Sequence, residues 1–158
     1  MRSAWEASKY QKPTLEEDWE AARRLHGHLG PWLALGMKAG AEALRILEAR
    51  PHFGLSARVG CRLATPVSCL IDGVQWMTGA TYGKRNLFAE ESEDVWIEVT
   101  RADTGARVRF ALRPGVPDAM ARWLEQMGDE PAAMHVYSLP TAELFDVSAV
   151  SPAREASS

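Results

Sequence analysis

The sequence lacks the features that mark several specialised classes of protein. It has only two cysteines, Cys61 and Cys69, too few for a framework of disulfides, so its thiols are expected to be mostly reduced. No apolar run approaches the roughly 20 residues that cross a bilayer, and the first residues lack the apolar stretch of a secretory signal. The net charge of -3 gives no electrostatic case for nucleic acid or an anionic membrane. These absences predict a cytoplasmic protein that binds neither nucleic acid nor a membrane.

The composition is that of an ordinary folded chain. Hydrophobic residues make up 46% and charged residues 25% of the 158 residues, which are usual values for a folded soluble protein. A chain of this length can bury a sizeable core without disulfides or a metal. We expect one domain over residues 14–150, an N-terminal arm at 1–13 and a flexible tail at 151–158. Trp5 and Tyr10 in the arm have no evident place in the core, which favours a homodimer.

Helix signals come first along the chain. Thr14 and Glu17 have the spacing of a capping box, which predicts a first helix that runs toward Leu25. Pro31 suits the first position of a second helix, because its missing N–H costs nothing there. Apolar residues on more than one stripe predict that this helix is largely buried and ends near Pro51. Its small residues would let another element approach closely: Ala34, Gly36, Ala39, Gly40 and Ala43.

Strand signals dominate from residue 55 onward. Ser68 is the expected N-cap of a short helix over 69–77, and a later amphipathic helix over 117–127 is expected to turn Leu124 and Met127 inward. Alternating residues predict four strands, the last two joined by a hairpin turn: 55–63, 86–89, 94–101 and 106–112. Helices followed by strands in this order predict an α+β fold, with the N-terminal helices packed on a mixed, mostly antiparallel sheet.

Two of the four histidines, His26 and His28, lie one glycine apart between the first two predicted helices. Imidazole is a preferred ligand of zinc and similar divalent metals. Residues two apart on a regular helix point in different directions, so two ligands at this spacing need the freedom of Gly27 and Gly30. We interpret the pair as metal ligands. The alternative is that one histidine caps the first helix and the other is solvated.

Cys69 opens the short predicted helix, where the helix dipole and free N–H groups favour a thiolate. Metal ligation and nucleophilic attack both require a thiolate, whereas the alternative is a small buried filler. Asp72, one turn later, could accept a hydrogen bond from a ligand imidazole, or could be a plain surface carboxylate. Together with the two imidazoles, the thiol completes the three protein ligands of an open zinc site.

A polar loop follows this helix, from Thr78 to Asn86. Its glycines, hydroxyls, lysine and amide predict the binding of an anionic or carbonyl group near the metal. The alternative is a polar turn that leads into a strand, and the spacing of glycine and lysine is not that of a phosphate-binding P-loop. The candidate residues for contacts to a substrate or around the metal are Asp72, Gln75, Thr78, Thr81, Lys84 and Asn86.

These patterns resemble the FmdE family, the E-subunit family of formylmethanofuran dehydrogenase. The first shared block is a His-Gly-His turn that runs into a Leu-Ala-Leu-Gly helix, here residues 26–36. The resemblance covers residues 17–112 and a closing segment over 139–147. The second shared block matches at Cys69, Asp72, Gln75, Thr78, Gly79, Thr81, Gly83, Lys84, Asn86 and Leu87. The chain departs from the family pattern at Gly30 and Ala80, where many members have cysteine, and this argues against redox chemistry by a cysteine pair.

The resemblance implies an α+β domain with a metal site, whose ligands would be His26, His28 and Cys69. The expected cofactor is zinc or another divalent transition metal. Some members belong to molybdenum or tungsten enzyme systems, which implies an accessory or sensor protein with a redox-enzyme partner. One alternative is a metal-dependent enzyme that acts on a small carbonyl, formyl or pterin-like substrate. A second alternative is a module that binds haem or another planar cofactor.

Overall fold

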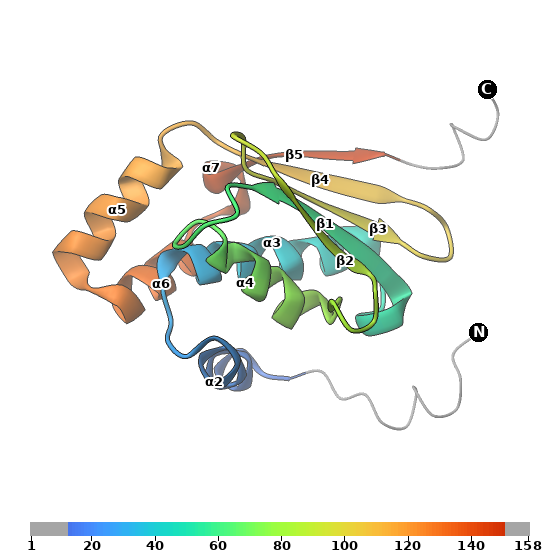
Figure 1. Cartoon of the computed structure of the whole chain (residues 1–158), viewed down its shortest axis with the longest axis horizontal. Coiled ribbons are helices and arrows are strands. Elements are labelled where there is room, and N and C mark those ends of the chain that lie inside the picture. The colour runs from blue at the N-terminus through green and yellow to red at the C-terminus, as the bar shows by residue number, and fades with distance from the viewer. Residues whose placement is uncertain (1–12, 151–158) are drawn as a thin grey trace.

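The computed structural model describes residues 13–150, in which helices pack against a mixed sheet of five strands (Figure 1). The sheet order is β2-β1-β3-β4-β5; β1 and β2 are parallel and the other neighbours are antiparallel. The predicted α+β fold is therefore confirmed. The strands are β1 (Leu55–Cys61), β2 (Leu87–Glu91), β3 (Trp96–Arg101), β4 (Arg107–Leu112) and β5 (Phe145–Val150).

Helices α3 and α4 lie under one face of the sheet, whereas α5 and α6 lie at one end of it (Figure 1). The helices of the described residues are α2 (Leu15–His26), α3 (Pro31–Leu47), α4 (Cys69–Thr78), α5 (Val116–Met127), α6 (Asp129–Ser138) and α7 (Thr141–Leu144), with a 3-10 turn η1 (His52–Gly54). None of these helices is long and apolar enough to span a membrane. The predicted tail at 151–158 and the arm up to residue 12 lie outside the described residues.

The predicted helix starts are confirmed at α2 and α3. The Thr14 hydroxyl accepts a hydrogen bond from the Glu17 amide at 3.2 Å, and the Glu17 carboxylate accepts one from the Thr14 amide at 2.8 Å. This reciprocal pair is the expected capping box. Pro31 is the first residue of α3. On α2 only Trp19 and Ala22 are buried, so the apolar stripe toward the core is short.

Glycines let α3 and α4 pack backbone against backbone. A Cβ on Gly36 would lie 2.0 Å from the Leu70 carbonyl oxygen, and a Cβ on Gly73 would lie 2.1 Å from the Leu33 carbonyl oxygen. Gly40, one turn after Gly36, faces the last turn of α4, so the two helices run in the same direction. The turn that precedes α3 therefore lies beside the start of α4, and this brings the two sequence motifs together.

The core lies between this helix pair and the inner face of the sheet. Its largest fully buried side chains include Phe110, Phe145, Leu33, Leu35, Met37, Leu70 and Ile97. Cys61 is fully buried on the inner face of β1, as its place in the alternating pattern predicts. The expectation that Leu124 and Met127 face inward is wrong: each side chain is 38% exposed. The reason is that α5 packs chiefly along α6, which leaves its second apolar stripe at the surface.

Candidate functional site

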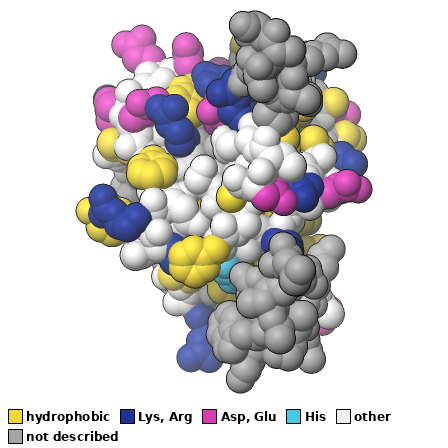
Figure 2. Space-filling view, turned by 90° about the vertical axis from the view of Figure 1, so that its right-hand side faces the viewer, with side chains coloured by type: hydrophobic (Ala, Val, Ile, Leu, Met, Phe, Trp, Pro, Cys, Tyr) yellow, Lys and Arg dark blue, Asp and Glu magenta, His cyan; other side chains and the backbone are white. Residues whose placement is uncertain are grey.

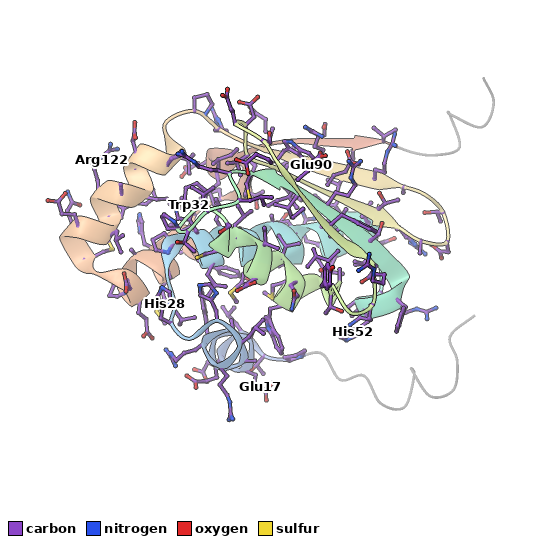
Figure 3. The ribbon with its side chains drawn as sticks, in the orientation of Figure 1. Glu17, His28, Trp32, His52, Glu90 and Arg122 are labelled. Atoms are coloured by element: carbon purple, nitrogen blue, oxygen red, sulfur yellow. The ribbon has the colours of Figure 1, made fainter. Side chains whose placement is uncertain are left out.

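The His-Gly-His turn ends α2 and leads into α3. Gly27 adopts a left-handed conformation with φ of 100°, and its N–H donates to the Arg23 carbonyl at 2.7 Å, which closes the helix. Leu29 is buried and anchors the turn in the core. The imidazole rings of His26 and His28 are stacked, with centroids 5.0 Å apart and an interplanar angle of 28°. His28 is exposed, at the loop between α2 and α3 (Figure 3).

His26 contacts the carboxylate of Asp72 on α4. Its Nδ1 lies 2.6 Å from Asp72 Oδ2, although the two residues are 46 positions apart in the sequence. The His26 side chain is only 11% exposed and that of Asp72 is 42% exposed. With an ionised carboxylate as acceptor, Nδ1 carries the hydrogen, so Nε2 of His26 is left with its lone pair. This is the arrangement in which a carboxylate orients a metal-ligating imidazole.

Cys69 lies one turn before Asp72, at the partly buried first position of α4. Burial raises the pKa of its thiol, and the negative charge of Asp72 raises this pKa further. The prediction that the helix start favours a thiolate is therefore wrong for this structure. The physical reason is that a preceding turn supplies acceptors: the Cys69 N–H donates to the Pro66 carbonyl at 3.1 Å. Ser68 is helical and makes no side-chain cap, which corrects its predicted role.

Metal ligation by His26, His28 and Cys69 stays a prediction. Across residues 13–150, no three histidine, cysteine, aspartate or glutamate side chains are arranged so that they could hold a metal ion. The structure joins His26 to Asp72 and stacks His28 on His26, while Cys69 shares the Asp72 end of α4. The residue types nevertheless fit zinc, which accepts imidazole, thiolate and carboxylate donors.

Thr78 has a structural task within the loop after α4. Its side chain is fully buried. The Thr78 hydroxyl donates to the Val74 carbonyl at 2.7 Å and accepts from the Ala80 amide at 3.1 Å. Both hydrogen bonds close the end of α4, so this hydroxyl is already engaged.

Asn86 clamps the same loop onto the segment that precedes β1. Its side-chain oxygen accepts from the Thr81 amide at 3.0 Å. Its side-chain nitrogen donates to the carbonyls of His52 and Leu55, at 2.8 and 3.0 Å. All of these partners are backbone atoms, so Asn86 positions the loop. Its predicted contact to a substrate is not tested.

Gln75, Thr81 and Lys84 line a cleft with a volume of about 790 Å³. The end of α3, the last turn of α4 and the exposed face of α2 form its walls. His26, His28 and Cys69 are not among the lining residues. Figure 3 shows the separation, because His28 and His52, a lining residue of the cleft, lie toward opposite ends of the helical layer. The histidine turn and this cleft are therefore two separate features.

His52 is the residue at this cleft that sequence reasoning missed. Its φ of 67° is in the left-handed region, which bulky residues rarely adopt. Partial burial of the ring lowers the pKa of His52, and the positive charge of Lys84 lowers it further. The sequence around His52 shows only a break before a strand, with no spacing that relates it to Lys84. Only the folded chain brings the two together.

Fold and site together define a small α+β protein in which a histidine–carboxylate pair joins two helices. Residues 25–146 match the family described as "FmdE, Molybdenum formylmethanofuran dehydrogenase operon". The chain therefore belongs to the FmdE family, which confirms the resemblance seen in its two motifs.

A similar solved structure is that of an FmdE-like protein of tungsten formylmethanofuran dehydrogenase from Syntrophus aciditrophicus. The sequence identity is 22%, the TM-score is 0.59, and the match covers 86% of this chain and 71% of that chain. At this identity the likeness supports the fold alone. No curated protein matches the chain.

Proposed function

We propose that the protein binds zinc or another divalent transition metal through His26, His28 and Cys69, and acts as an accessory or sensor protein for a molybdenum or tungsten redox enzyme. The accessory role is supported by membership of a family that is described by a molybdenum formylmethanofuran dehydrogenase operon. A bound zinc ion would supply a Lewis-acidic centre or a folding constraint at the junction of α2, α3 and α4.

The contact between His26 Nδ1 and Asp72 carries this proposal. A histidine that serves only as a helix cap has no need of a carboxylate from a distant helix. An imidazole that ligates a metal through Nε2 almost always donates its other N–H to such an acceptor. His28 is stacked on the same ring, and the Cys69 thiol is one helical turn from the carboxylate. Four donors of the types that zinc accepts are thus gathered at one junction.

The metal content of purified protein tests the proposal. Protein prepared without chelator is expected to hold one zinc equivalent by elemental analysis. We expect His26→Ala and Cys69→Ser to lose it, because each removes one of three ligands. Asp72→Asn keeps all three ligands but weakens the orientation of His26, so we expect zinc affinity to fall by about tenfold or more.

The matched control is His135→Ala, which removes a histidine that packs against Trp123 at 4.6 Å between ring centroids. This variant is expected to keep its zinc. Protein that is metal-free however it is prepared would contradict the proposal, and so would equal zinc loss in the His135 variant and the His26 variant. Circular dichroism of each variant checks that it folds.

The alternative of a metal-dependent enzyme receives less support. Such an enzyme needs a cleft beside the metal, but the cleft of this structure is lined by none of the three proposed ligands. Among the described residues, Trp76 is the tryptophan that lines this cleft. The second alternative requires a planar cofactor held between a histidine ligand and tryptophans, and the cleft that Trp76 lines includes neither His26 nor His28.

A further inference from the structure

The cleft at the far end of α4 has the size of a site for a small ligand. Its volume of about 790 Å³ falls within the range of small-molecule pockets, about 300–1,000 Å³. Figure 2 looks onto this end of the molecule, where a histidine side chain (cyan) lies beside hydrophobic side chains (yellow). Much of the wall is apolar, and its apolar members are Leu25, Ala41, Leu44, Trp76 and Met77.

Lys84 is the uncompensated charge of this cleft. Within residues 13–150 no carboxylate pairs with its ammonium group, which lies 5.8 Å from the centroid of the Phe53 ring. Its charge reaches into the cleft, because it acts on His52. The two arginines of the wall differ from it, since Arg45 is paired with Glu42 at 2.8 Å and Arg50 has a partner of its own.

The acidic residues of the wall are already turned toward other groups. Asp18 accepts a hydrogen bond from the indole N–H of Trp76 at 3.0 Å, which also fixes the orientation of that ring in the wall. Glu48 interacts with Arg101. The charge that is left for an incoming group is therefore a single positive one. One ammonium beside two carboxylates suits a singly charged anion and disfavours a diphosphate or triphosphate.

The Lys84 end of the cleft is held by a backbone that the fold keeps under strain. The clamp from Asn86 fixes His52 in its left-handed conformation. Gly79 backs directly onto the ring, where a Cβ would lie 2.3 Å from His52 Nδ1. Strained backbone of this kind costs on the order of 1–3 kcal/mol and clusters at ligand-binding sites. The clamp fixes the loop that carries Lys84 relative to the cleft wall.

We propose that this cleft binds a small organic monocarboxylate with an apolar body, with Lys84 as the counter-ion of the carboxylate. The body would pack against Trp76 and Leu44, and the side chains of Gln75 and Thr81 are the polar neighbours at the charged end. The inference does not depend on the proposed metal centre, because the two share none of their residues.

Ligand-observed saturation-transfer NMR tests the proposal on the full chain, with benzoate and hexanoate as probes. Benzyl alcohol and phenyl phosphate are the comparison ligands. We expect both carboxylates to bind in the millimolar range and more tightly than the alcohol or the phosphate. In Lys84→Met the affinity for benzoate is expected to fall by about tenfold or more, because a hydrogen-bonded charge partner is lost.

Arg85→Met is the matched control, since it removes one positive charge from the same loop. Arg85 lies over Tyr82 at 4.8 Å and does not line the cleft, so benzoate binding is expected to stay at the wild-type level. Benzoate binding that is equal in Lys84→Met and wild type would overturn the proposal. Two other results would also overturn it: equal binding of benzoate and benzyl alcohol, or no binding of either carboxylate. Zinc content measured on Lys84→Met separates this outcome from failure of the metal centre.

Discussion

The His28 ring leaves an unfilled position beside it, at Gly30. A Cβ built on Gly30 would lie 3.6 Å from His28 Nε2, an ordinary van der Waals distance. The φ of Gly30 is -137°, which any residue can adopt. Many relatives are expected to have a cysteine here, and the geometry accepts one. The other departure from the family pattern, Ala80, is fully buried, so a thiol there would lie inside the core.

This geometry predicts that Gly30→Cys strengthens the proposed metal site. The new thiol would stand beside His28, and a further soft ligand favours zinc. We expect the zinc affinity to rise by about tenfold or more, as measured by competition with a chromogenic chelator. Gly30→Ser is the matched control, because it adds the same Cβ without sulfur. A rise of equal size in both variants would show that the thiol is not a ligand.

At the scale of elements, the contact between α3 and α4 decides where the histidine turn lies. The sequence predicts both helices and the small residues that allow a close approach. It does not predict the partner of α3, because small residues show only that some element comes near. The spacing from Cys69 is enough to single out Asp72, whereas the contact of Asp72 with His26 depends on the parallel packing of these two helices.

The closeness of this packing predicts a large loss of stability in Gly36→Ala. The added methyl group would lie 2.0 Å from the Leu70 carbonyl oxygen, which is backbone and cannot rotate away. We expect the free energy of unfolding to fall by about 3 kcal/mol, measured by urea denaturation. Gly83→Ala is the control, because a Cβ at Gly83 meets no heavy atom within 4 Å. A change of similar size in both variants would contradict the proposed role of the helix contact.

At the scale of the whole molecule, the sequence could predict the order of elements but not the cleft. Caps, prolines and alternating residues are local signals, and they locate α2, α3, β1, β3 and β4 to within a few residues. The cleft is assembled from α2, the end of α3, the segment before β1 and the loop after α4. No local pattern relates these four segments. The sequence predicts that Lys84 binds a ligand near the metal, but the structure places this lysine at a separate cleft.

One consequence of this assembly is a pH dependence of global stability. Partial burial and the charge of Lys84 lower the pKa of His52 in the folded protein, whereas an unfolded histidine titrates at about 6.5. The unfolded chain therefore binds this proton more readily than the folded chain does. Stability rises with pH through the window below about pH 6.5, and it is lost as the pH falls through that window.

His52→Asn removes this titration and keeps a residue that tolerates the left-handed conformation. We expect the rise in unfolding free energy below about pH 6.5 to become shallower in this variant, as measured by urea denaturation at a series of pH values. Lys84→Met is expected to make the rise shallower to a smaller extent, because it removes only one of the two causes of the lowered pKa. A slope that is unchanged in both variants would show that His52 titrates alike in the folded and unfolded chains. The cleft would then lack the positive potential on which its proposed ligand depends.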